Sequence, residues 1–82
     1  MNLQQIIDKI QNDLSSASET VISADTELLM SGIVESLAVV TLIAWLEDQM
    51  RTAIDPGLVT LENFETPTAI HALCESVAAT SL

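Results

Sequence analysis

The sequence predicts an all-α protein, a small acidic four-helix bundle built as one domain over residues 1–82. The length is that of a single domain. Hydrophobic residues make up 49% of the chain, yet only Trp45 and Phe64 are aromatic, and a sheet would need more β-branched and aromatic runs. Apolar residues also recur at helical spacing in three separate segments. We therefore expect three longer helices, one short helix and a long first loop.

The first helix is expected over residues 3–14. Asn2 and Gln5 have the spacing of a loose capping box before it. Its apolar stripe is formed by Leu3, Ile6, Ile7, Ile10 and Leu14.

Residues 15–35 show no sustained helical period and predict a long loop. A connection of this length in a small domain indicates a functional segment. Four aliphatic residues are expected to hold it on the core: Val21, Ile22, Leu28 and Leu29.

The second helix is expected over residues 36–50, a stretch without glycine or proline. Its buried stripe is predicted to be Val39, Leu42, Ile43, Leu46 and Met50, with the spacing of a helix that lies on a core. Ser36 stands at its first position. A serine there is either a plain helix cap or the place where an attached phosphate is stabilised by free N–H groups and the helix dipole.

The last third of the chain begins with a turn at residues 55–57, before which Ile54 is expected to pack inward. A short third helix lies within residues 58–64, with Thr60 as its cap. The fourth helix starts with Thr66 as its N-cap and Pro67 as its first residue. This helix is expected to fray from residue 78. Its buried stripe is predicted to be Ile70, Leu73, Cys74 and Val77.

The formal net charge is −10, with Lys9 and Arg51 as the only strong bases. Such a surface repels nucleic acid and anionic membranes and attracts basic patches of protein partners, although acidity also serves solubility alone. A single cysteine excludes an internal disulfide and a cysteine-based metal site. No basic and apolar signal segment or membrane span is apparent. We therefore expect a cytoplasmic protein.

The segment SGIVESL, residues 31–37, followed by an amphipathic helix, resembles the phosphopantetheine-attachment motif of the acyl and peptidyl carrier protein family. Ser36 matches the modified serine of the family, Leu37 the leucine after it, and Gly32 an upstream glycine. Glu35 stands where the family usually has aspartate. The long first loop is also similar to that of carrier proteins.

The resemblance implies a 4′-phosphopantetheine cofactor on Ser36, whose thiol would hold an acyl or aminoacyl group as a thioester. It implies a phosphopantetheinyl transferase, a loading ligase and acyl-processing enzymes as partners, with Glu35 and Leu37 helping the transferase to recognise the serine. Such carriers serve fatty acid, polyketide or nonribosomal peptide biosynthesis. The GIVES segment is more similar to D-alanyl and peptidyl carriers. We expect a free-standing monomer, not an enzyme.

The exposed face of the second helix is the expected docking surface, formed by Leu37, Thr41, Ala44, Trp45 and Asp48. Large exposed aromatic residues often anchor interfaces, but Trp45 could instead tilt back over the first loop. A different class of function is an unmodified helical adaptor that binds a partner through this face. His71, the only candidate base, is expected at the edge of the core, and no catalytic or metal site is expected.

Overall fold

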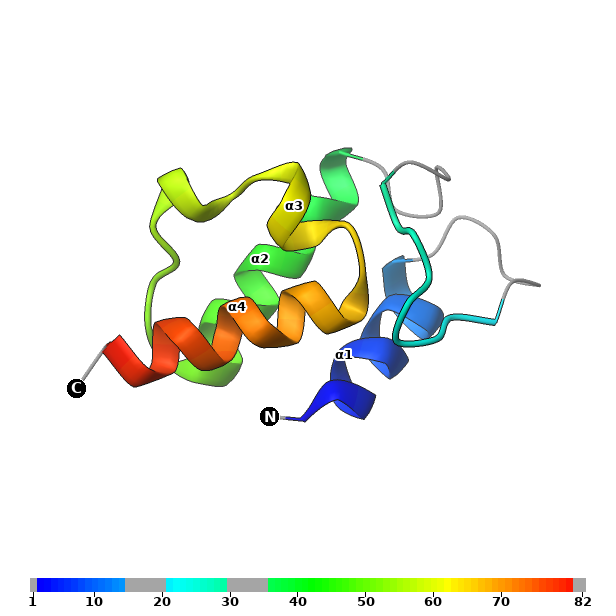
Figure 1. Ribbon diagram of the computed structural model, residues 1–82, viewed down its shortest axis with the longest axis horizontal. Coiled ribbons are helices and arrows are strands. Elements are labelled where there is room, and N and C mark those ends of the chain that lie inside the picture. The colour runs from blue at the N-terminus through cyan, green and yellow to red at the C-terminus, as the bar shows by residue number, and fades with distance from the viewer. Residues whose placement is uncertain (1, 15–20, 30–35, 81–82) are drawn as a thin grey trace.

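The computed structural model describes residues 2–14, 21–29 and 36–80 (Figure 1). It contains helices and turns and, within those ranges, no strand, which confirms the all-α class. Nor does any helix among them have the length and apolar character to cross a membrane. The elements in chain order are α1 (Leu3–Lys9), the π-helical turn η1 (Ile10–Leu14), α2 (Ser36–Met50), the 3₁₀ turn η2 (Pro56–Leu58), α3 (Leu61–Phe64) and α4 (Pro67–Thr80).

Helix α1 begins with the capping box that the sequence predicts. The Asn2 Oδ1 accepts a hydrogen bond from the Gln5 N–H at 2.9 Å, and the Asn2 N–H donates to the Gln5 Oε1 at 2.8 Å. Helical structure continues to Leu14 as expected, but its last five residues form a π-helical turn. Such turns hold one more residue than an α-helical turn, a detail that apolar spacing does not reveal.

Helix α2 has the predicted bounds and ends in a Schellman motif. The Thr52 N–H donates to the Glu47 carbonyl at 3.3 Å. Arg51 takes the left-handed conformation that this motif requires, with φ of 56°, where glycine is the usual residue. A non-glycine residue there costs on the order of 1 kcal/mol.

Helices α3 and α4 both start at predicted caps. The Thr60 Oγ1 accepts from the Asn63 N–H at 3.3 Å, and the Thr66 Oγ1 accepts from the Ala69 N–H at 3.1 Å. Pro67 is the first residue of α4, where its missing N–H removes nothing from the helix. The four-residue α3 is too short to be stable alone, so the burial of Phe64 holds it in place.

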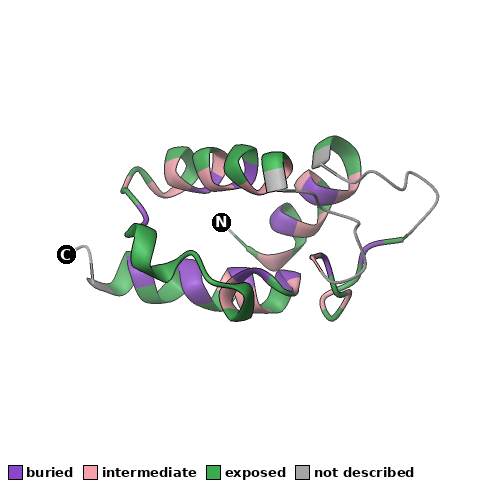
Figure 2. Cartoon of the chain, turned by 90° about the horizontal axis from the view of Figure 1, so that it is seen from above, coloured by how far each residue is buried: buried purple, intermediate pink, exposed green. Residues whose placement is uncertain are grey.

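The core lies around α4, which contacts α1, α2 and α3 (Figure 1). Figure 2 shows buried positions on the helices and also on the loop before α2. Both Ile54 and the predicted stripe of α4 are buried as expected. The buried hydrophobic residues are Ile6, Ile10, Ile22, Leu28, Leu42, Leu46, Ile54, Phe64, Ile70, Leu73, Cys74 and Val77.

Residues 21–29, which we call the strap, are tied to two other parts of the chain. The Ile22 N–H donates to the Gln11 Oε1 at 2.6 Å. At the α3–α4 corner, the Leu28 N–H donates to the Glu65 carbonyl at 2.8 Å, and the Thr68 N–H and Oγ1 both donate to the Ala24 carbonyl, at 3.1 and 2.9 Å.

Three of the four aliphatic residues expected to hold this segment do face the core. Ile22 and Leu28 are buried, and Leu29 packs against the core. The expectation was wrong for Val21, which is 83% exposed. The strap turns between these positions at Ser23, whose N–H donates to the Thr26 Oγ1. Because this turn and the bonds from Thr68 fix the backbone, the adjacent Val21 does not need to be buried.

Candidate functional site

Ser36 is the first residue of α2. The first N–H groups of a helix have no partner within it, and the helix dipole is positive there, so this end favours an attached anion. The structure describes the backbone of Ser36 but not its side chain, and Glu35 and Gly32 lie outside the described residues. The placement of Ser36 at a helix start therefore agrees with the prediction.

The outward side of α2 carries a continuous row of exposed residues, which we call the outer strip: Leu37, Val40, Thr41, Ala44 and Asp48. Leu37, next to Ser36, is 85% exposed, and Val40 is 65% exposed. The Thr41 Oγ1 donates to the Leu37 carbonyl at 3.3 Å, which turns this hydroxyl back onto the helix. The strip is therefore apolar near Ser36 and becomes acidic at Asp48.

Trp45 does not belong to this strip. It is half-buried and packs against the core, so the expectation of an exposed indole on the docking face was wrong. The ammonium of Lys9 lies 5.8 Å from the centroid of the ring. The indole therefore lies between the Lys9 side chain, at the end of α1, and the core, and its use by a partner would be limited to its exposed edge.

The predicted and observed positions of Trp45 differ because α2 faces the core at a different angle from the one predicted. The predicted stripe of α2 placed the centre of the buried face about 120° from Trp45 at 100° per residue. In the structure Leu42 and Leu46 are the buried residues of this helix, and their mean direction lies only about 80° from Trp45. Val39, Ile43 and Met50 pack on one side of that centre, and Ala38 and Trp45 on the other.

A second group of exposed apolar residues was missed by sequence reasoning: Leu58, Val59 and Leu61, which run from η2 into α3. Their apolar character is visible in the sequence, but the short helix predicted within residues 58–64 gives no indication of which of its side chains are exposed. The Asn63 Nδ2 donates to the Leu58 carbonyl at 2.7 Å and fixes the local backbone. These side chains therefore project from an ordered turn.

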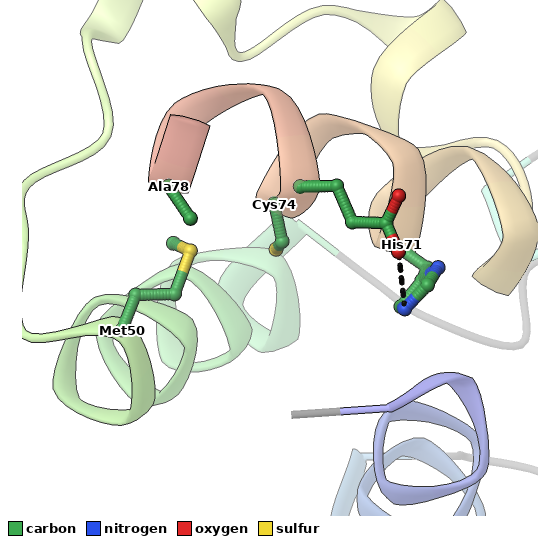
Figure 3. A pocket seen from close by; sticks show the side chains of 5 residues that line it. Met50, His71, Cys74 and Ala78 are labelled. Atoms are coloured by element: carbon green, nitrogen blue, oxygen red, sulfur yellow. Dashed lines mark ion pairs between the residues drawn. The ribbon is translucent and has the colours of Figure 1, made fainter. Parts of the chain in front are cut away.

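A shallow pocket of about 100 Å³ lies between the C-terminal end of α2 and α4 (Figure 3). Met50, Cys74 and Ala78 form its apolar part. His71 and Glu75 border it and form an ion pair at 3.3 Å between the His71 Nε2 and the Glu75 Oε1.

Cys74 carries the thiol of this pocket, and its burial raises the pKa of that thiol from 9.0 to about 11. A thiol with such a pKa stays protonated at neutral pH and reacts slowly. His71 does lie at the edge of the core, half-buried, as expected. The pocket therefore brings together a histidine and a cysteine without an activated nucleophile.

The described residues contain no metal centre: across 2–14, 21–29 and 36–80, no three His, Cys, Asp or Glu side chains gather in a way that could hold an ion. The features that carry chemical information are thus Ser36 at the start of α2 and the outer strip beside it. Comparison with known proteins adds no relative, since no protein family matches the chain and no curated protein matches it significantly.

Proposed function

We propose that this protein is a free-standing carrier that holds an acyl or aminoacyl group as a thioester on a 4′-phosphopantetheine arm attached to Ser36. The observation that carries the proposal is the position of Ser36 as the first residue of the fifteen-residue helix α2, within the segment SGIVESL. A phosphodiester at this position would be stabilised by the free N–H groups of the first turn. The exposed Leu37 beside it is accessible to a modifying enzyme.

A carrier needs a thiol that is both mobile and exposed, because a thioester must be presented to several enzymes in turn. Cys74 does not meet this need, since it is buried and its pKa is raised. An arm on Ser36 would supply the thiol from outside the fold. The protein itself would then serve as an acidic four-helix bundle that presents the cargo and performs no catalysis.

The partners proposed are a phosphopantetheinyl transferase, an acyl- or aminoacyl-loading ligase and downstream acyl-processing enzymes. Glu35 and Leu37 would guide the transferase, and the outer strip would dock the partners. The strip carries one acid, Asp48, and is otherwise neutral. This favours a D-alanyl or peptidyl carrier over the strongly acidic docking face of fatty acid synthesis. We expect a cytoplasmic monomer that contacts neither nucleic acid nor membranes.

The test is intact mass after incubation with coenzyme A and a broad-specificity transferase. The wild-type protein should gain one phosphopantetheine, and Ser36→Ala should gain none. Ser76→Ala, on α4, is the matched control and should be modified like the wild type. Loss of the Ser36 hydroxyl should cost at most about 0.5–2 kcal/mol of stability, which circular dichroism and urea unfolding will verify. A wild type that stays unmodified with several transferases would refute the carrier proposal, and modification of Ser36→Ala would refute the site.

A second candidate function is an unmodified helical adaptor. The exposure of Leu37 and Val40 favours it, because adjacent exposed aliphatic side chains are typical of interaction surfaces. The mass experiment separates the two functions. An adaptor would remain unmodified, and its partner binding would depend on Leu37 and Val40 but not on the Ser36 hydroxyl.

A further inference from the structure

The exposed aliphatic residues that run from η2 into α3 form a surface of their own. Leu58, Val59 and Leu61, which we call the turn patch, are 38%, 39% and 51% exposed. Helix α3 packs on α4, whereas the outer strip belongs to α2 (Figure 1). The turn patch is therefore carried by a different part of the fold from the outer strip, and its side chains do not belong to the core.

The backbone that carries the turn patch is fixed by its own hydrogen bonds. The Leu58 N–H donates to the Asp55 carbonyl at 2.8 Å, and the Val59 N–H donates to the Pro56 carbonyl at 3.1 Å. The Asn63 Nδ2 donates to the Leu58 carbonyl at 2.7 Å. The aliphatic side chains are thus held in place before any partner arrives, which lowers the entropy cost of binding.

Carboxylates flank the turn patch at both ends. Asp55 is the N-cap of η2, before the patch. Glu62 follows Leu61 directly, and Glu65 lies one helical turn beyond Leu61 on the same side of α3. All three acids are exposed, and the sequence contains no lysine or arginine after Arg51. The patch is therefore apolar in the middle and purely acidic at its edges.

This combination determines which surface fits the turn patch. A second copy of the chain would place these carboxylates against another molecule with a net charge of −10. Anionic lipid headgroups and nucleic acid phosphates would be repelled in the same way. A protein surface that is apolar at its centre and basic at its edge matches both parts of the patch, because interface cores are apolar and opposite charges across the rim guide docking.

We propose that the turn patch is a docking surface for a protein partner that has an apolar centre edged by lysine and arginine residues. The three aliphatic side chains pack on the apolar centre, and Asp55, Glu62 and Glu65 face the basic edge. This surface needs neither a modified Ser36 nor the outer strip. The inference therefore stands apart from the proposed carrier function.

The experiment uses as its probe a helical peptide with a stripe of leucine edged by lysine. Titrated into isotope-labelled protein at low salt, it should shift the amide NMR signals of residues 55–65 most strongly. Leu61→Gln should weaken the peptide about fivefold or more, as expected for a residue at the centre of an interface, and Leu58→Gln provides a second measurement. Glu62→Gln should weaken it about two- to fivefold, the range of an exposed charge pair. A peptide with glutamate in place of lysine should not bind.

Leu37→Gln and Asp48→Asn are the matched controls, because they remove one aliphatic side chain and one charge from the outer strip. Both should bind the peptide like the wild type, and so should Ser36→Ala, which makes the result independent of the carrier function. Circular dichroism verifies that each variant is folded.

Three results with the peptides would overturn the proposal: the strongest shifts at residues 37–48, equal losses in the controls and the patch variants, or equal binding of the glutamate peptide. Self-association that Leu61→Gln abolishes would instead identify a second copy as the occupant. Binding to phosphatidylcholine vesicles that Leu61→Gln abolishes would identify a lipid surface. Either of these results would also overturn the proposal.

Discussion

The ammonium of Lys9 lies 5.8 Å from the centroid of the Trp45 ring and 2.8 Å from the Oδ2 of Asp13. One cation thus links the end of α1 to the middle of α2 across the half-buried indole. A cation over an aromatic face contributes about 0.5–1 kcal/mol at an exposed site. The contact accompanies the orientation of α2 that places Trp45 at the edge of the core and not on the outer strip.

The sole tryptophan makes this contact directly measurable. Native Trp45 should emit between the wavelengths of buried and fully solvated indole, with partial protection from acrylamide. Lys9→Gln should increase quenching because it uncovers the ring. Asp13→Asn retains the lysine and is expected to change quenching less. Emission typical of a fully solvated indole in the native protein would contradict the packing described for Trp45.

Trp45→Ala should destabilise the protein by about 1–3 kcal/mol. Truncation of a fully buried large aromatic residue costs about 3–5 kcal/mol, and this side chain is only half-buried. Urea unfolding monitored by circular dichroism gives the value. A loss below about 0.5 kcal/mol would mean that the indole does not contribute to the packing of α2 on the core.

The buried thiol of Cys74 should make the folded protein less stable at alkaline pH. Burial raises the pKa of its thiol from 9.0 to about 11. Above pH 9 the unfolded chain loses this proton while the folded chain retains it, so the unfolded state is favoured progressively until about pH 11. Urea unfolding at pH 7, 9, 10 and 11 should show this slope, and Cys74→Ala should show a shallower one at a lower starting stability. Identical slopes would contradict the shift.

Loss of the Thr68 hydroxyl should weaken the attachment of the strap to α4. Its Oγ1 donates to the Ala24 carbonyl at 2.9 Å, and Thr68→Val removes this bond with little change of shape. The expected loss is about 0.5–1.5 kcal/mol, with faster amide exchange in residues 21–29. Thr68→Ser retains the hydroxyl and serves as the control. Unchanged exchange in Thr68→Val would show that the backbone bond from the Thr68 N–H suffices.

The acidic surface predicts a gain of stability with salt. The chain has twelve acidic residues and only two strong bases. The repulsion among the carboxylates weakens as the ionic strength rises. The melting temperature should therefore increase by a few degrees in 0.5 M NaCl or millimolar MgCl₂, measured by differential scanning calorimetry. KCl at the same concentration should act like NaCl, and a flat or falling response would contradict the repulsion.

Local signals in the sequence were sufficient for the helices. The capping box of Asn2 and Gln5, the cap at Thr60 and the pair Thr66–Pro67 each fix a helix start through contacts within a few residues. These interactions depend on neighbouring side chains, so they can be read from spacing. The bounds of α2 and the burial of Cys74 were predicted from a different signal, the helical spacing of apolar residues.

Tertiary features could not be read in this way. The side of α2 that faces the core is set by packing against η1 and α4, and a rotation of about 35° moved Trp45 from the predicted strip to the edge of the core. Val21 has the same aliphatic character as Ile22, and only the hydrogen bonds of the strap decide which of them is buried. At the candidate site, the start of α2 was predicted from the sequence, whereas the exposed turn at residues 58–61 and the backbone of Arg51 emerged from the structure.

The hydrogen bond between Thr68 and Ala24 joins residues 44 positions apart. Contacts of such sequence separation form late, because the chain between them must first lose its conformational freedom. During synthesis the strap cannot close until α4 has begun to emerge, although α1 and α2 are complete long before. Residues 21–29 therefore take their final course only once α4 has begun to form, so a shorter chain contains the helix that begins at Ser36 without the fixed strap.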